Sequence, residues 1–244
     1  MFDKIKRFLH NLFCKPTEIK PPPAENQTRR NEDLSAESQL AIFMDRYLYD
    51  RFPTGSSFSS IRRVYDKQEQ LKGIDVEFIG TDGRVYNVDE KAQLYYLNQN
   101  LPTFAFELLS FQKGYDTIGW LCNSNLKTDL YMLIWPFAST DKSKGIRWEQ
   151  FTKVDCLLIQ KQKVLKLLAD KGLTPDRLIT DAKRIRASGK TGRISIQGVH
   201  GIYYFASSSQ YYKEAPINVI ISKPLLQGIA SRRYIVTPDD VITE

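Results

Sequence analysis

The segment 73–92, GIDVEFIGTDGRVYNVDEKA, most narrows the structures that this chain can adopt. Two runs rich in Val, Ile, Phe and Tyr flank the turn sequence Thr-Asp-Gly at residues 81–83, which predicts an antiparallel hairpin. The second run carries Asp89, Glu90 and Lys91 in succession. Charged side chains are avoided inside a sheet unless they are paired or bind something. The hairpin therefore raises the question of what its charges contact.

Side chains along a strand alternate between its two faces. Asp89, Lys91 and Gln93 therefore share one face, whereas Glu90 lies on the other. The hairpin also brings Asp75 beside this strand, so we expect Asp75 and Asp89 to converge near Lys91. Two adjacent carboxylates repel each other, and a hard divalent cation such as Mg²⁺ relieves that repulsion. A nearby lysine can then act on an attacking water and stabilise charge on a phosphate.

An Asp, a hairpin and then an (Asp/Glu)-x-Lys sequence resemble the signature of the PD-(D/E)XK nuclease superfamily. Here the signature is GID at 73–75 and DEK at 89–91, followed by Gln93. The resemblance covers residues 35 to about 140 and implies a restriction-endonuclease-like core of helix, three or four strands and helix. It also implies Mg²⁺- or Mn²⁺-dependent cleavage of phosphodiester bonds. The residue before Asp75 is Ile74 rather than proline, which departs from the family pattern.

The resemblance further implies roles for the residues that match the motif. Asp75 and Asp89 would bind the metal, Lys91 would position the nucleophilic water, and Gln93 would support the site. Together with Glu90, these residues make the hairpin the expected catalytic site.

A helix is expected ahead of the hairpin, with Ser35 as its N-cap and Pro53 beyond its end. The family pattern places an acidic residue on such a helix, where it completes the metal site. Glu37 matches that role, and Asp45 is the competitor because it lies closer in sequence to the strands. The sequence leaves both residues open as the third metal ligand.

Strand-like and helical segments alternate along the remaining chain, which predicts an α/β protein. The expected fold is a restriction-endonuclease-like mixed sheet flanked by helices, with a C-terminal α/β elaboration. Further strands are expected over 57–65, 103–111, 117–122, 130–138, 154–160, 192–198, 201–209 and 217–223. Further helices are expected over 161–171, 176–187 and 224–230.

The chain is expected to have three parts. Residues 1–14 have apolar and basic faces at helical spacing, residues 15–33 form a proline-rich linker, and residues 34–244 form the nuclease-like domain. A basic amphipathic helix lies on a membrane surface, docks on a partner or packs on its own domain. The sequence leaves these alternatives open.

Composition limits the chemistry and the compartment. Three scattered cysteines without a CxxC pair favour a reducing, cytoplasmic compartment, with attachment to a membrane surface through residues 1–14 as the alternative. Two histidines argue against a histidine-based metal site or catalytic pair. The net charge of +7 favours a polyanionic partner, and DNA is expected before RNA.

Basic residues also gather in two places. Arg62 and Arg63 lie on the first expected strand and can line the same groove as the hairpin charges. A second cluster spans a helix end and the following loop, where it either contacts phosphates or forms a solvated face. Its members are Lys183, Arg184, Arg186, Lys190 and Arg193.

The sequence thus predicts metal-dependent hydrolysis of DNA at Asp75, Asp89, Glu90 and Lys91. Two alternatives remain. One is a catalytically inactive nucleic-acid-binding protein with the same fold. The other is a membrane- or partner-docking protein that uses residues 1–14, with the charges of the hairpin incidental.

Overall fold

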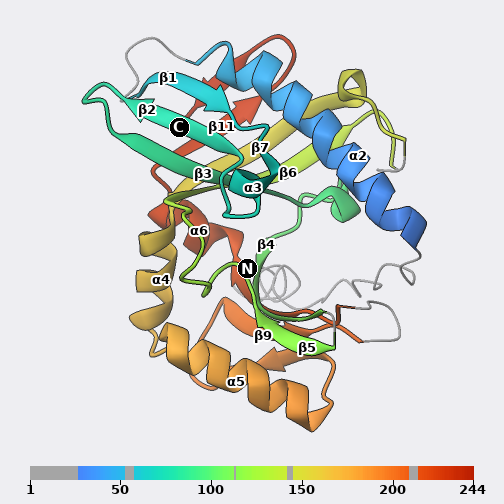
Figure 1. Cartoon of the computed structure of the whole chain (residues 1–244), viewed down its shortest axis with the longest axis vertical. Coiled ribbons are helices and arrows are strands. Elements are labelled where there is room, and N and C mark those ends of the chain that lie inside the picture. Colours follow the sequence, from blue (N-terminus) through green and yellow to red (C-terminus); the bar gives the residue numbers. More distant parts are fainter. Residues whose placement is uncertain (1–26, 53–57, 113, 142–144, 209–213) are drawn as a thin grey trace, which may run out of the picture.

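The structure is a computed structural model that describes residues 27–52, 58–112, 114–141, 145–208 and 214–244. Two sheets form its frame (Figure 1): a seven-stranded mixed sheet and a five-stranded antiparallel sheet. The expected helix over 1–14 and most of the expected linker lie outside the described residues. Within them, no helix is long and apolar enough to cross a membrane.

The larger sheet contains the hairpin strands as its second and third strands. Strands β3 and β6 are parallel, and all other neighbours in this sheet are antiparallel. Its strands, in spatial order, are β1 (Phe58–Arg63), β2 (Val76–Gly80), β3 (Val85–Ala92), β6 (Leu130–Ala138), β7 (Phe151–Gln160), β11 (Arg232–Val236) and β12 (Val241–Thr243).

The smaller sheet is built from two distant parts of the chain, and every neighbouring pair in it is antiparallel. Strand β10 pairs with β4, from more than a hundred residues earlier, and with β9. In spatial order the strands are β5 (Tyr115–Ile118), β4 (Thr103–Gln112), β10 (Ile217–Ser222), β9 (Ile202–Ala206) and β8 (Gly192–Ser195).

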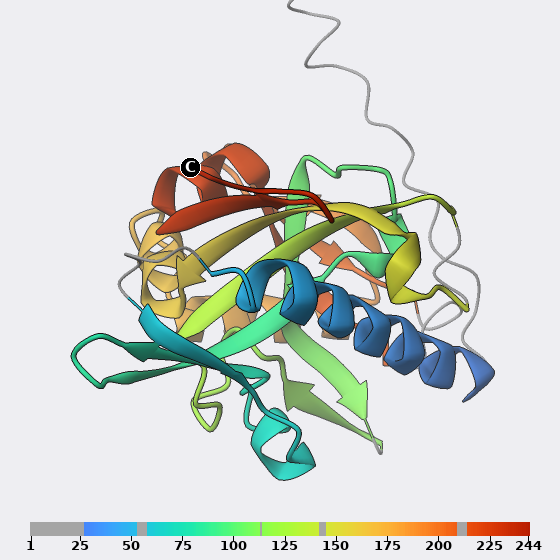
Figure 2. The same cartoon turned by 90° about the horizontal axis from the view of Figure 1, so that it is seen from above.

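Helix α2 (Gln27–Met44) continues into a π-helical turn, η1 (Asp45–Tyr49), and runs across one face of the larger sheet (Figure 2). The helix begins at Gln27, so residues 27–33, expected in the linker, belong to α2, and Ser35 is not its N-cap. The other helices are α3 (Lys67–Gln70), η2 (Leu94–Tyr96), η3 (Trp148–Gln150), α4 (Lys161–Ala169), α5 (Pro175–Ser188) and α6 (Lys223–Ile229).

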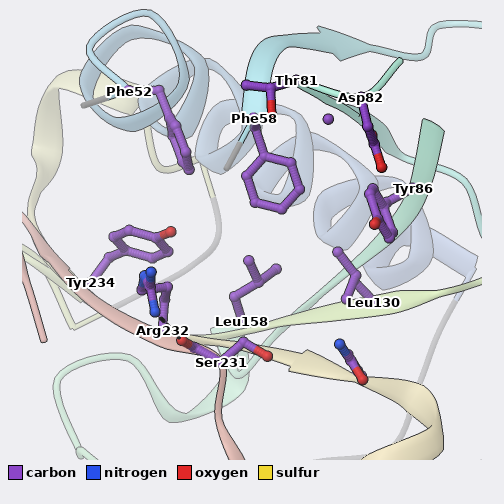
Figure 3. Close-up of a pocket in the computed structure, with 12 residues that line it drawn as sticks. Phe52, Phe58, Thr81, Asp82, Tyr86, Leu130, Leu158, Ser231, Arg232 and Tyr234 are labelled. Atoms are coloured by element: carbon purple, nitrogen blue, oxygen red, sulfur yellow. Dashed lines mark hydrogen bonds between the residues drawn. The ribbon is translucent and has the colours of Figure 1, made fainter. Parts of the chain in front are cut away.

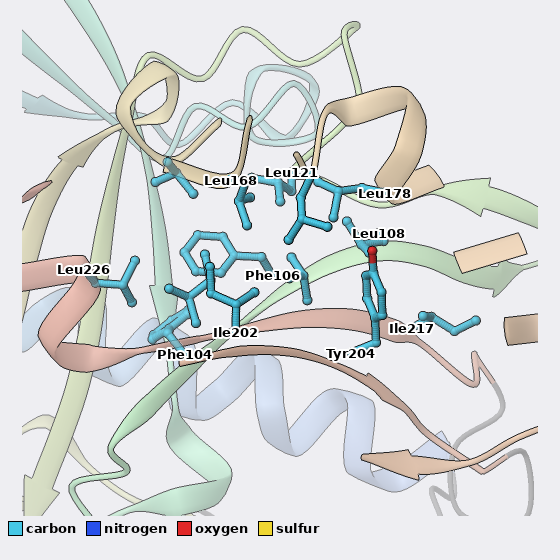
Figure 4. Close-up of a cluster of buried hydrophobic side chains, with 14 of the residues drawn as sticks. Phe104, Phe106, Leu108, Leu121, Leu168, Leu178, Ile202, Tyr204, Ile217 and Leu226 are labelled. Atoms are coloured by element: carbon cyan, nitrogen blue, oxygen red, sulfur yellow. The ribbon is translucent and has the colours of Figure 1, made fainter. Parts of the chain in front are cut away.

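Two hydrophobic cores lie on the two faces of the larger sheet. The first joins α2 and η1 to the sheet through residues such as Phe43, Leu48 and Phe78, all of which are fully buried. The second joins the opposite face to the smaller sheet and to α4 and α5 (Figure 4). It includes Phe106 and Leu178. Strand β3 therefore presents one row of side chains to each core.

The predicted mixed α/β class is confirmed, and the finer assignment to a restriction-endonuclease-like fold stays a prediction. The expected boundary of the core is wrong. Strands β7, β11 and β12 belong to the same sheet as the hairpin, so this sheet extends far beyond residue 140. The C-terminal segments are therefore part of both sheets rather than a separate elaboration.

Candidate functional site

The predicted hairpin is present and fixes the register of the charged residues. Gly80 N–H donates to the Arg84 carbonyl oxygen at 2.7 Å, and Gly83 has a φ of 80°, which favours glycine in this turn. Strand β3 pairs with β2 on one side and with β6 on the other. Because β3 is internal to the sheet, its charged side chains are held by pairing on both sides.

Asp89 and Lys91 share a face of β3, as the alternation predicted. The Lys91 ammonium donates to Asp89 Oδ1 at 2.5 Å. Asp89 is only 2% exposed, and its Oδ2 has no hydrogen-bond partner among the described residues. The Lys91 side chain is 30% exposed, and its Nζ lies 5.4 Å from the ring centroid of Trp120. A buried carboxylate is thus joined to a lysine that reaches solvent.

Asp75 joins this pair from the preceding strand segment. Its Oδ2 accepts a hydrogen bond from Glu90 N–H at 2.8 Å. Burial and the adjacent charge of Asp89 raise the pKa of Asp75 to about 7, although Lys91 acts in the opposite direction. The site therefore has an excess of negative charge that Lys91 compensates only in part.

Glu37 contributes to the same site from helix α2. Burial lowers the pKa of Lys91, but the charges of Asp89, Asp75 and Glu37 outweigh that effect and raise it. Lys91 therefore carries its proton at neutral pH. The competing residue, Asp45, pairs with Arg63 instead, so no contact joins it to Lys91 among the described residues.

Gln93 and Glu107 lie at the edge of the site. The Gln93 amide donates to the Thr103 carbonyl oxygen at 2.8 Å, while its Oε1 is buried without a hydrogen-bond partner among the described residues. Burial and Glu214 raise the pKa of Glu107, and Lys91 lowers it. Lys91 thus lies between the two sheets, with carboxylates on both sides.

Glu90 points to the opposite face, where its charge is compensated. Tyr49 donates to Glu90 Oε1 at 2.6 Å, and Arg63 pairs with Glu90 Oε2 at 2.5 Å. Arg63 also contacts Asp45 at 2.7 Å, and its side chain is only 10% exposed. Arg63 is therefore a structural cation, in place of the phosphate contact expected from the sequence. Asp45 is its partner rather than a residue of the Lys91 site.

Arg62 remains on the same face as Asp89, as the cross-strand register shows. It lies opposite Glu77, which lies opposite Asn87, two residues before Asp89. Its side chain is 70% exposed and pairs with Glu77. Of the two arginines predicted to line the groove, Arg62 alone is accessible.

The second predicted basic cluster is divided by the smaller sheet. Helix α5 packs on the core face of that sheet, where Arg186 pairs with Asp116 at 3.2 Å. Arg184 pairs with Asp181 of the same helix, and Lys183 and Lys190 are exposed. Arg193 lies on the outward face of β8. The cluster expected as one phosphate-binding patch is therefore not continuous.

A metal would be held by fewer residues than the sequence predicted. Among the residues that the structure describes, no group of three or more His, Cys, Asp and Glu side chains is placed to hold a metal. The pair of Asp75 and Asp89 nevertheless fits a cation such as Mg²⁺, which binds one or two carboxylates and keeps several waters. The unpartnered Oδ2 of Asp89 and the raised pKa of Asp75 both indicate uncompensated negative charge.

A separate pocket of about 370 Å³ lies on the Glu90 face of the larger sheet (Figure 3). The larger sheet curls around Phe52, which contacts Phe58 of β1 and Tyr234 of β11 at ring-centroid distances of 6.2 and 5.7 Å. Tyr86 and Arg232 also line the pocket. It contains none of the residues around Lys91 and is therefore distinct from the candidate site.

Three residues near the site were not predicted from the sequence. Trp120 lies under Lys91, and Tyr131 lies opposite Asp89 in the parallel β3–β6 pair. Lys161, at the start of α4, is buried and within electrostatic reach of Asp89, whose charge raises its pKa against the larger effect of burial. All three come from elements beyond the hairpin, and no local pattern indicates their position.

Comparison of the chain with protein-family models, with curated proteins and with solved structures finds no match. The resemblance to PD-(D/E)XK nucleases therefore rests on the motif residues. The geometry of Asp75, Asp89 and Lys91 is the evidence from which a function can be argued.

Proposed function

We propose that this protein is a metal-dependent nuclease that hydrolyses phosphodiester bonds of DNA at Asp75, Asp89 and Lys91. One observation carries the proposal: two carboxylates and one lysine lie together on an internal part of the larger sheet, and the lysine compensates their charge incompletely. Uncompensated buried charge is costly in a purely structural role. Such arrangements are concentrated at functional sites.

Mg²⁺ bound by Asp75 and Asp89 would act as a Lewis acid on the phosphate and lower the pKa of a coordinated water. Lys91 supplies a different contribution. Because its pKa is raised, it is protonated at neutral pH and donates hydrogen bonds. It therefore orients a water molecule or stabilises charge on a phosphate oxygen, and it does not act as a general base.

Gln93 and Glu37 support the site from two sides. The hydrogen bond from Gln93 to Thr103 fixes the amide between β3 and the start of β4, and its free Oε1 can accept a hydrogen bond from a water. The charge of Glu37 raises the pKa of Lys91 further, by less than the charges of Asp89 and Asp75 do. Both residues act through Lys91 and its surroundings, so we expect smaller effects from their substitution than from substitution of Lys91.

Calorimetric titration with Mg²⁺ and Mn²⁺ tests the metal site. The wild type should bind the ion, and the double variant Asp75→Asn/Asp89→Asn should not. Asp82→Asn is the matched control, because Asp82 is an exposed carboxylate at the hairpin turn. Absence of metal binding to the wild type would contradict the proposal.

Cleavage of circular, linear and single-stranded DNA tests the reaction. Lys91→Ala should reduce the rate by about 10²–10³-fold, which is typical for the loss of one group that stabilises transition-state charge. Lys127→Ala is the control, because Lys127 is an exposed lysine. Nucleic-acid binding without cleavage by the wild type would favour the catalytically inactive alternative.

A further inference from the structure

The smaller sheet has one buried face and one outward face. Phe104, Phe106 and Tyr204 point into the second core and are at most 4% exposed. The alternating residues point outward, and among them Tyr203 and Phe205 are half-buried. Aromatic rings on the outward face of a sheet contribute nothing to the core beneath it, so they require a different explanation.

The register places these outward residues in two rows across four strands. One row runs Glu107, Asn218, Phe205, Arg193, from β4 to β8. The next row runs Ala105, Ile220, Tyr203, Ser195, and Ile220 in the middle of it is buried. Three spacings between neighbouring strands make each row about 14 Å long.

A cation and aromatic rings meet at the β8–β9 end of these rows. The Arg193 guanidinium lies over the Tyr203 ring, 4.1 Å from its centroid. Arg193 is exposed and makes no ion pair with any residue that the structure describes. We call the set Arg193, Tyr203 and Phe205 the aromatic face.

We propose that the aromatic face binds single-stranded nucleic acid. Aromatic rings on a sheet stack on unpaired bases regardless of their sequence, and the exposed Arg193 contacts phosphate or stacks on a base. A duplex hides the faces of its bases, so this surface discriminates against it.

This inference stands without the proposed function. Fluorescence anisotropy of the full chain with labelled oligothymidylate, and with a duplex of the same length, tests it. EDTA in the buffer separates binding from cleavage. We expect tighter binding to the single strand, and a weakening of about fivefold or more for both Tyr203→Leu and Arg193→Glu.

Matched variants distinguish stacking and local charge from general effects. Tyr203→Phe keeps the ring and should bind like the wild type. Tyr65→Leu removes a ring that is 80% exposed elsewhere, and Arg184→Glu makes the same charge change on α5. Both should leave single-strand binding within about twofold, a small change on the scale of one stacked base. Arg193→Glu alters an exposed side chain, so it remains informative if Tyr203→Leu does not fold.

Several results would overturn the inference: equal affinity for duplex and single strand, unchanged binding in both face variants, or equal losses in the controls. A change in oligomeric state of the face variants, without single-strand binding by the wild type, would assign the surface to a second copy and also overturn it. Single-strand binding that depends on Tyr203, without cleavage, would keep the binding surface and reject the nuclease. Cleavage with no dependence of binding on Tyr203 would do the reverse.

Discussion

Both faces of strand β3 carry acidic side chains, but the two faces differ in how completely these charges are paired with cations and hydrogen-bond donors. On one face, Glu90 accepts hydrogen bonds from Tyr49 and Arg63, and Arg63 also holds Asp45. On the other face, Lys91 contacts Asp89 and interacts electrostatically with Asp75, and one oxygen of Asp89 has no partner among the described residues. The acidic residues of the motif therefore differ in their surroundings rather than in their chemistry.

This difference separates a structural role from a functional one. A buried charge with a complete set of partners stabilises a single arrangement, whereas an incompletely compensated pair lowers stability and is retained where it binds something. The Glu90 face belongs to the first class and the Asp89 face to the second. Each prediction below tests whether the two faces differ in this way.

The largest expected effect is that of Arg63→Ala. It leaves Glu90 and Asp45 without their buried cation, so we expect the free energy of unfolding to fall by about 4 kcal/mol. Urea unfolding measures this value. Arg62→Ala is the control, because Arg62 is 70% exposed and its pair with Glu77 should contribute less than about 1 kcal/mol. Equal losses in the two variants would remove the distinction between the faces.

Asp155→Asn tests a second fully compensated carboxylate. Asp155 contacts Lys223 at 2.8 Å and Arg233 at 2.9 Å. Burial raises its pKa, but these two cations outweigh burial and hold the pKa below its ordinary value. We expect the variant to lose about 3 kcal/mol of stability at pH 7.

The pH dependence of Asp155→Asn follows from the lowered pKa. The contribution of the carboxylate is complete above the unfolded pKa of about 3.9 and is lost as the pH falls through the folded pKa. The stability difference between the wild type and the variant should therefore shrink in acid. A difference that grows below pH 4 would contradict this assignment.

Asp75→Asn should raise the stability of the protein, whereas Asp155→Asn lowers it. The pKa of Asp75 is about 7 in the folded protein, so its charged form is penalised by folding, and wild-type stability falls as the pH rises from about 4 to about 7. The variant should be more stable than the wild type at pH 8, and equally stable near pH 4. Thermal unfolding across this range measures both. A variant destabilised at pH 8 would place Asp75 among the compensated carboxylates.

Mg²⁺ should stabilise the protein through the Asp89 face alone. At ten times the dissociation constant, a ligand that binds only the folded state adds about 1.4 kcal/mol, or about 3–6 °C in Tm for a chain of this size. Asp89→Asn should abolish the shift, and Asp82→Asn, at the exposed turn, should retain it. An equal shift in both variants would locate the ion elsewhere.

Much of the secondary structure could be predicted from local patterns. The apolar run at 130–138 became β6 without change, and the Thr-Asp-Gly turn joins β2 to β3. Helix α5 begins and ends within one residue of its prediction because Thr174 caps its start and Gly189 ends it with a φ of 66°. Strands β11 and β12 were missed, since each has five residues or fewer and the first begins with two arginines.

The candidate site was predictable only as far as the hairpin determines it. Alternation along β3 placed Asp89 and Lys91 together and Glu90 apart, and the structure confirms this separation. Arg63 pairs with Asp45 of η1 instead of lining the site, because η1 packs beside it. No sequence pattern near residue 63 reveals that packing. Trp120 comes near Lys91 only after the chain has passed through β4 and β5, so no local pattern reveals this contact either. Non-local contacts therefore decided which predicted residues remain in the site.

The order of the strands has a consequence for how this protein can be divided. The chain enters the larger sheet with β1–β3, leaves it for β4 and β5, returns with β6 and β7, leaves again for β8–β10, and finishes with β11 and β12. Each sheet is interrupted by the other, so no single cut divides the chain into two fragments that each contain one whole sheet. Pairing of β4 with β10 also requires closure of a long loop, which slows folding. We expect the two sheets to unfold in one cooperative transition, and the surface between them to be gained or lost as a unit.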